Sequence, residues 1–145
     1  MTPKDLQKLA LEPAMTLLPT KMTGGFKLLT AIALQESGLA HRKQISGPAR
    51  SFWQFEPVGI EGVETHPATA QHATEVRLAL SIERDEVYEA IQYNDVLAAA
   101  YARLLLWRHP KPLPLDQGKA WDYYVSLWRP GHERPERWVK AWAAA

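Results

Sequence analysis

Apolar residues recur through most of this chain three and four positions apart, which is the spacing of one face of an α-helix. The clearest example follows Asn94, where Leu97, Tyr101 and Leu104 fall on one face and the pattern stops before Pro110. No segment alternates apolar and polar residues for long enough to make a convincing strand, and the chain contains no repeat. The pattern therefore predicts an all-α fold.

We expect about seven short helices, most of them separated by Pro or Gly. They cover residues 3–12, 26–37, 66–80, 81–88, 95–109, 117–128 and 133–143, and residues 60–64 add a turn or two. Residues suited to capping precede four of these helices: Thr2, Ser81, Asn94 and Asp116. The 26–37 helix is apolar on most of its circumference, so we expect it to be the central one. A chain of 145 residues has the size of one domain, so residues 1–145 should form a single domain.

One carboxylate, Glu36, falls on a helix face that is otherwise apolar. Leu29, Ile32 and Ala33 share this face because they precede Glu36 by seven, four and three positions. A carboxyl group held against apolar neighbours has its charged form disfavoured, which raises its pKa. A raised pKa is what a general acid needs near neutral pH, so Glu36 is a candidate catalytic residue.

A loop without helical or strand periodicity follows this helix at residues 39–57. It is rich in basic residues and carries three aromatic ones, Phe52, Trp53 and Phe55. Long ordered loops in compact domains are usually functional. We therefore expect the loop to form part of a site beside Glu36.

Four segments of the chain follow one another in an informative order. They are Glu36-Ser37 at a helix end, residues 48–54 in the loop, the helix at 94–105, and residues 122–125 ahead of 129–131. In this order they resemble the lytic transglycosylase and goose-type lysozyme superfamily. That pattern is Glu-Ser on a helix, Gly-Leu-Met-Gln in a loop, an Asn-initiated helix, and Ala-Tyr-Asn-Ala-Gly-Pro-Gly. Ser51, Phe52 and Trp53 stand here in place of Gly, Leu and Met, and the last element is matched loosely.

The resemblance implies a lysozyme-like domain that cleaves peptidoglycan between N-acetylmuramic acid and N-acetylglucosamine without a cofactor. In that family one Glu, here Glu36, donates a proton to the leaving oxygen. It then acts as base on the muramyl hydroxyl, which gives an anhydro sugar. Residues that the resemblance places against the substrate or the Glu are Ser37, Ser46, Phe52, Trp53, Gln54 and Tyr124. Trp53, in the loop, is the tryptophan assigned to the glycan. Those on helical stripes are assigned to the core: Trp121, Trp128, Trp138 and Trp142.

A second carboxylate leaves an alternative open. Glycoside hydrolysis usually uses two carboxylates about 5–10 Å apart. Glu56 and Glu61 follow the loop, and Glu56 is the candidate partner of Glu36 in a hydrolysing lysozyme. Glu56 could instead bond a loop N–H group or pair with Arg50. A further alternative is a non-catalytic virion component or glycan-binding module on the same fold.

Composition limits the partners. The net charge of +1 gives no sign of a nucleic-acid-binding polycation, and we interpret the basic-aromatic residues 107–111 as a solvated helix end. The five His residues lack metal-binding spacing, so no metal is expected. No apolar run is long enough to span a membrane, and Asp5 and Glu12 interrupt any signal-peptide core. We expect a phage or prophage product made in the cytoplasm, with glycan strands and other virion proteins as partners.

Overall fold

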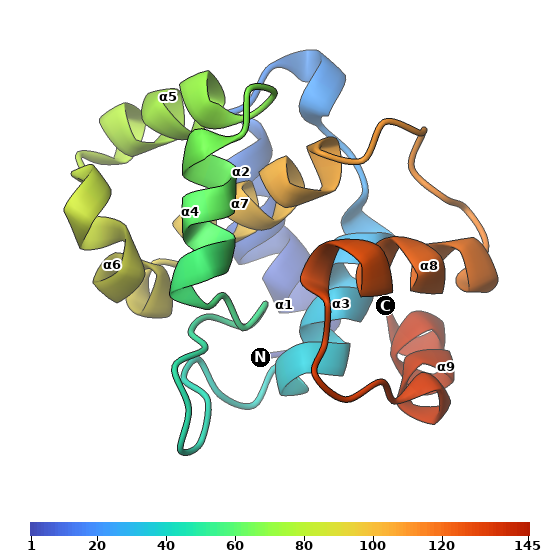
Figure 1. The fold of residues 1–145 in the computed structure, drawn as a ribbon. Helices are drawn as coiled ribbons and strands as arrows, with labels where there is room; N and C mark the ends of the chain where they lie inside the picture. The colour runs from blue at the N-terminus through green and yellow to red at the C-terminus, as the bar shows by residue number, and fades with distance from the viewer.

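The computed structural model describes all residues, 1–145, and it is helical, which confirms the all-α prediction (Figure 1). The α-helices are α1 (Pro3–Leu6), α2 (Glu12–Met15), α3 (Phe26–Ser37), α4 (Pro57–Thr65), α5 (Ala70–Leu80), α6 (Val87–Tyr93), α7 (Asp95–Trp107), α8 (Gln117–Trp128) and α9 (Pro135–Ala144). Shorter turns are the π-helical η1 (Gln7–Leu11) and the 3₁₀ turns η2 (Thr20–Met22) and η3 (Arg84–Glu86). No strand forms, and extended pairing is limited to the isolated bridges Lys43–Arg50 and Arg50–Phe55. None of the helices combines the length and the apolarity that crossing a membrane requires.

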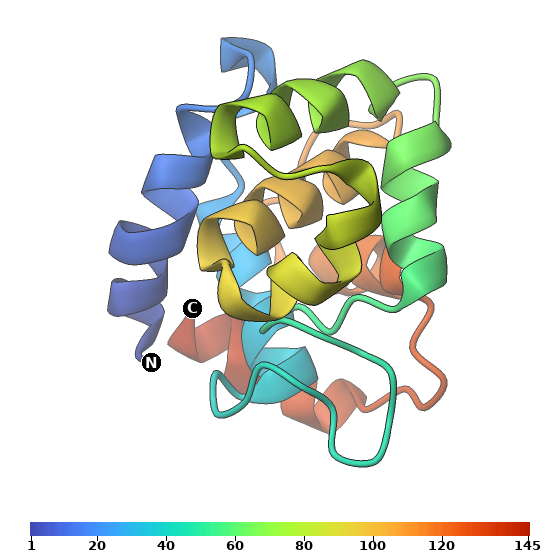
Figure 2. The ribbon, with the colours of Figure 1, turned by 90° about the vertical axis from the view of Figure 1, so that its left-hand side faces the viewer.

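Helix α7 lies at the centre of the fold. All of its residues from 97 to 106 are buried, and it contacts α2, α3, α4, α5, α6 and α8. Four of the buried residues are alanines, which let neighbouring helices approach closely. The expected central helix, α3, is buried along most of its length but packs chiefly against α9, so the more fully enclosed helix is α7. Figure 2 shows α5 and α6 covering one side of α7.

The first helical segment runs further than the sequence suggests. Thr2 caps the first helix as expected, and it forms a capping box with Asp5, whose N–H donates to Thr2 Oγ1 at 3.1 Å. The expected interruption at Pro13 is wrong, because the chain continues through η1 into α2 as one helical run. The wider π-helical turn before Pro13 accommodates a residue that has no N–H group to donate.

Two local boundaries also differ from the prediction. Ser81 does not cap the segment that follows it; it ends α5 in the left-handed conformation, with φ 57°. The cap of the next turn is Glu83, whose N–H bonds Glu86 Oε1 at 2.9 Å. The turn expected at 60–64 is a full helix, α4, because Pro57 fits the first helical position.

The segment between α3 and α4 is a folded loop, visible at the bottom of Figure 2. Arg50 and Phe55 exchange backbone hydrogen bonds of 2.8 and 2.7 Å, and Ser51 N–H donates to the carbonyl of Arg42 at 2.7 Å. The Arg42 guanidinium donates two hydrogen bonds, of 2.9 and 2.8 Å, to the carboxylate of Asp95 at the start of α7. These contacts fix the loop against the end of the central helix.

Candidate functional site

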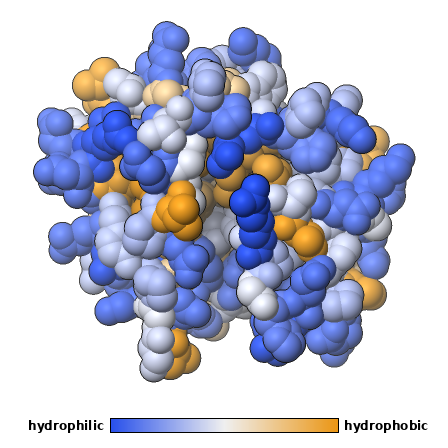
Figure 3. All heavy atoms as spheres, in the orientation of Figure 1, coloured by the Kyte–Doolittle hydropathy of each residue, from blue (hydrophilic) through white to orange (hydrophobic).

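A cleft of about 440 Å³ opens where the end of α3, the folded loop and the end of α8 meet. Glu36, Gln54, Glu56, Tyr124 and Trp128 all line it. An adjoining hollow of about 410 Å³ shares Gln54, Glu56, Trp128 and Arg129 with the cleft and extends it toward α4. Figure 3 shows apolar residues at the base of the hollows on this face, surrounded by hydrophilic side chains. The site therefore suits an extended polar ligand rather than a small apolar one.

Glu36 reaches the cleft because of where its helix ends. Leu29, Ile32 and Ala33 on the same face of α3 are fully buried, as the periodicity predicts, while Glu36 is only half-buried. One residue further on, Ser37 ends the helix and Gly38 reverses the chain with φ 64°. The carboxyl group thus sits at the exit of the apolar core, with its oxygens toward the cleft.

Opposing effects act on the ionisation of Glu36. Burial is the largest and raises its pKa above the ordinary value of 4.5. The Tyr124 hydroxyl donates to Glu36 Oε1 at 2.8 Å and, with the positive charge of Arg137, acts in the opposite direction. The negative charge of Glu56 adds to the upward shift. The net result is a raised pKa, as the apolar helix face predicts.

Tyr124 is held rigidly by aromatic neighbours on α8 and α9. Its ring stacks on Trp138 at 5.2 Å with an interplanar angle of 6°, and Trp121 contacts it at 5.6 Å. Burial and the adjacent Glu36 raise the pKa of Tyr124 well above its usual value. The phenol therefore stays protonated and serves as a fixed donor to Glu36.

Gln54 and Glu56 lie across the cleft on the folded loop. Gln54 is half-buried, has φ 55°, and donates from Nε2 to the carbonyl of Ser51 at 2.8 Å. Glu56 is exposed, makes no ion pair, and its side chain does not cap α4. Arg50, suggested as its partner, instead donates to the carbonyl of Tyr88 at 2.9 Å. Glu56 is thus a free carboxylate in the same cleft as Glu36.

The expectation that Phe52 and Trp53 line the cleft is wrong. Trp53 is 0% exposed and Phe52 is 2% exposed. Trp53 Nε1 donates to the carbonyl of Leu29 at 2.8 Å, so the indole is a core residue that packs against α3. The tryptophan on the cleft is Trp128, which had been assigned to the core; its Nε1 donates to the carbonyl of Trp53 at 2.9 Å.

Ser37 and Ser46 also lie outside the cleft lining. Ser37 is 4% exposed, and its Oγ donates to the carbonyl of Ala33 at 2.9 Å and accepts from the N–H of Leu39 at 3.2 Å. It stabilises the end of α3 and does not face a ligand. Ser46 is exposed in the folded loop with φ 58°, and it makes no hydrogen bond to Glu36.

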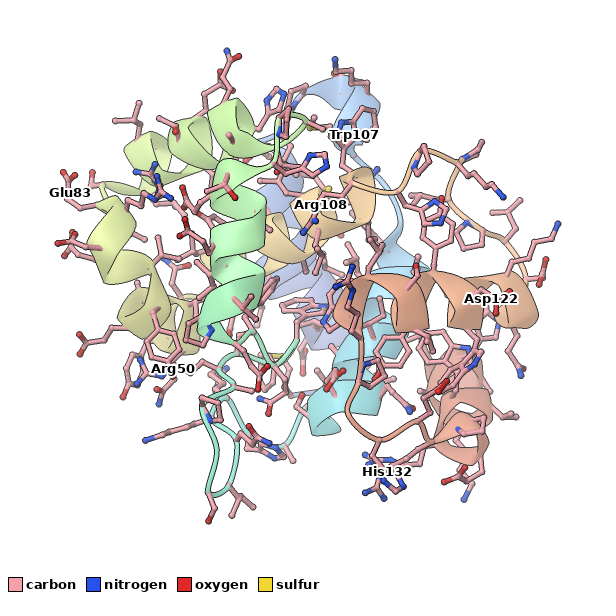
Figure 4. The ribbon with its side chains drawn as sticks, in the orientation of Figure 1. Arg50, Glu83, Trp107, Arg108, Asp122 and His132 are labelled. Atoms are coloured by element: carbon pink, nitrogen blue, oxygen red, sulfur yellow. The ribbon has the colours of Figure 1, made fainter.

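A basic rim borders the cleft on the side of α9, and sequence reasoning missed it. It comprises Arg129, Arg134 and Arg137, with His41 and His132 nearby. Figure 4 shows His132 on the segment that joins α8 to α9. The backbone of this rim is fixed to α3, because Gln35 Nε2 donates to the carbonyl of Arg134 at 3.0 Å. The three Arg residues within positions 129–137 were the sequence feature that could have predicted this rim.

The comparisons with known proteins give no relative for this site. No family model, no curated protein and no solved structure matches the chain. Nowhere do three His, Asp or Glu side chains gather as a metal ion would require. The residues of the cleft itself therefore have to indicate the chemistry of the site.

Proposed function

We propose that this protein cleaves the glycan strands of peptidoglycan between N-acetylmuramic acid and N-acetylglucosamine, with Glu36 as the acid and then the base. The observation that carries the proposal is a Glu with a burial-raised pKa that faces an extended polar cleft. The substrate class, peptidoglycan, is suggested by the order of the four sequence segments that resemble the lytic transglycosylase superfamily. The basic rim fits a glycan whose muramyl groups carry peptides with free carboxylates.

In this mechanism protonated Glu36 donates its proton to the glycosidic oxygen as the bond to the anomeric carbon breaks. The resulting carboxylate then removes the proton of the muramyl hydroxyl, whose oxygen attacks the anomeric carbon. Glu36 ends protonated, the products are an anhydromuramyl end and a free sugar hydroxyl, and no water is consumed. Tyr124 keeps the carboxyl group in place through its 2.8 Å hydrogen bond.

Glu56 supports a hydrolytic alternative. It lines the same cleft, carries no ion pair, and lies close enough to Glu36 to influence its pKa. In that mechanism Glu36 remains the acid, while Glu56 either activates a water molecule or stabilises the developing positive charge on the sugar. The product then has a reducing end.

Digestion of purified peptidoglycan, analysed by mass spectrometry, tests both mechanisms. Wild type and Glu56→Gln should release anhydromuramyl fragments, whereas Glu36→Gln should release at least about a hundredfold less. Reducing ends that depend on both carboxylates would establish the hydrolase instead. Glu61→Gln is the matched control, because Glu61 is an exposed carboxylate of α4 outside the cleft and pairs with Arg84. Glycan binding without any release would assign a non-catalytic role, either in a virion or as a glycan-binding module.

A further inference from the structure

A separate hollow, here called the basic hollow, lies away from the cleft and its adjoining hollow. It is formed by η2, the end of α7 and the segment that follows α7. Its volume is about 560 Å³, and it shares no lining residue with the cleft. Trp107, one of its lining residues, lies at the opposite end of the molecule from His132 in Figure 4. The hollow therefore needs an explanation that is independent of glycan cleavage.

Arg103 lines this hollow and is only 3% exposed. Its Nε and Nη1 atoms have no acceptor in the protein, and Nη2 makes only a long 3.4 Å contact with the carbonyl of Thr23. No carboxylate lies within ion-pairing distance of it. Burial lowers its pKa to about 10, so the guanidinium is still charged at neutral pH. A buried charge without a partner is costly to keep, which makes its presence here informative.

No acidic residue lines the hollow. The basic residues Lys21, His109 and Lys111 line it together with Arg103. The Lys21 ammonium and the Arg103 guanidinium each lie 5.9 Å from the Trp107 ring. Basic side chains thus gather around one half-open hollow, and no acidic residue balances them.

The segment that closes the hollow is fixed in place. Tyr123 of α8 donates its hydroxyl hydrogen to the carbonyls of Lys111 and Pro112. The Tyr123 ring also stacks on His109 at 4.0 Å. His109 Nδ1 accepts from the Lys111 N–H at 3.3 Å. The backbone that carries His109 and Lys111 is therefore already in place before any ligand arrives.

We propose that this hollow binds a phosphoryl group, with the Arg103 guanidinium as its main contact and Lys21 and Lys111 as supporting charges. A guanidinium matches the paired oxygens of phosphate or carboxylate through two parallel N–H donors. Three permanent positive charges favour the doubly charged phosphoryl group over a single carboxylate. The volume leaves room for more than one phosphate ion, so the natural ligand is a small phosphate monoester, which keeps the doubly charged group.

Thermal unfolding of the whole protein in phosphate and in chloride of matched ionic strength tests the site, because a ligand that binds only the folded state raises Tm. We expect inorganic phosphate to raise the Tm of wild type in a saturable manner and to shift the Trp107 indole resonance in an NMR titration. Arg103→Met should abolish both effects. It should leave Tm in chloride unchanged or higher, because it removes an unpaired buried charge.

A pair of surface variants keeps the test decisive if Arg103→Met does not fold. Lys21→Gln should weaken phosphate binding about tenfold, in line with loss of one charge-assisted contact. Lys27→Gln is the matched control, because Lys27 also lies over a tryptophan, Trp142 at 4.9 Å, but outside the hollow. Equal phosphate affinity in wild type and Lys21→Gln, or no phosphate effect on wild type, would overturn the proposal.

Two further ligands identify the source of the phosphoryl group. A phosphorylated monosaccharide that binds more tightly than inorganic phosphate would support a small phosphate ester. A single-stranded DNA oligonucleotide that competes with phosphate, with an affinity that falls steeply with salt, would point to a singly charged phosphodiester chain and contradict the preference for a doubly charged group. Acetate that binds as tightly as phosphate would contradict the preference for phosphate. None of these outcomes depends on whether Glu36 cleaves glycan.

Discussion

Burial and hydrogen bonding act in opposite directions on the Glu36 carboxyl group. Its apolar helix face raises the pKa, while the Tyr124 hydroxyl and the charge of Arg137 favour the ionised form. Burial has the larger effect, so the protein keeps a carboxyl group whose charged form is disfavoured. Such a cost is expected at a residue that exchanges protons during catalysis.

This cost makes the stability of the protein depend on pH. Because the folded state holds the Glu36 proton more tightly than the unfolded state, stability falls as pH rises from about 4.5 through the folded pKa. We expect Glu36→Gln to be more stable than wild type at pH 7 and equal to it below pH 4, where Glu36 is protonated in both states. Urea unfolding at both values measures the difference. A Glu36→Gln protein that is less stable than wild type at pH 7 would contradict the burial argument.

The hydrogen bond from Tyr124 can be removed with little change in shape. Tyr124→Phe should raise the Glu36 pKa further, because the lost donor had favoured the carboxylate. The alkaline limb of the pH–activity profile should therefore move to higher pH, and stability should fall by about 1 kcal/mol. Phe is the conservative choice because the stacked ring on Trp138 is kept. An unchanged limb would show that Tyr124 does not position the acid.

At this scale the sequence identified some site residues and misplaced others. Helical periodicity found Glu36 because its face is defined by regular spacing. Phe52 and Trp53 lie in a loop, where no period tells which side chains are buried, and both proved to be core. Trp128 reaches the cleft because it occupies the last turn of α8, where its side chain is only half-buried.

The folded loop of residues 38–56 forms one wall of the cleft beside the end of α3. Its connection to α7 is the bidentate pair between Arg42 and Asp95, with bonds of 2.9 and 2.8 Å. The Arg42 guanidinium also lies 4.4 Å from the Phe52 ring, which is itself buried. The loop is therefore fixed both to the central helix and to the core.

Asp95→Asn should loosen this loop without unfolding the protein. Since both side chains are partly exposed, we expect a global loss of about 1 kcal/mol or less. Amide hydrogen exchange should speed up in residues 42–55, while α7 stays protected. Glu61→Gln breaks a surface pair of the same 2.8 Å length and should leave the loop unchanged. Unchanged loop exchange in Asp95→Asn would show that the loop is held by its own contacts.

Element boundaries were predictable where a side chain specifies them. Asn94 and Asp116 cap α7 and α8 as expected, with bonds of 3.0 and 2.9 Å to backbone N–H groups. Pro13 misled the prediction because a π-helical turn lets the helix pass through it. Ser81 misled it because the same residue type can end one helix or begin the next.

At the scale of the whole molecule, one hydrophobic core supports both the cleft at Glu36 and the basic hollow at Arg103. The cleft depends on contacts between segments far apart in sequence, such as Glu36 with Tyr124 and Trp53 with Trp128. Periodicity cannot predict such pairings, and the chain positions of the motifs only suggested them. The same holds for the basic hollow, which joins Lys21 to residues of α7 and the segment after it.

Trp53 is the core residue that supports the cleft, because its carbonyl accepts a hydrogen bond from Trp128 on the cleft. Trp53→Ala should destabilise the protein by about 3–5 kcal/mol, because it empties a fully buried site beneath α3. Trp128→Ala, at a half-buried position on the cleft, should cost less stability and weaken glycan binding more. Chemical unfolding and glycan titration of both variants measure the contrast. Equal stability losses would contradict the division between core and cleft tryptophan.

The most direct test of the central claim is the product of peptidoglycan digestion by wild type and Glu36→Gln. The proposed mechanism predicts soluble fragments with anhydromuramyl ends from wild type, and a fall of at least about a hundredfold in their release by Glu36→Gln. Glu61→Gln should match wild type. Undiminished release by Glu36→Gln would contradict the assignment of Glu36 as the catalytic acid.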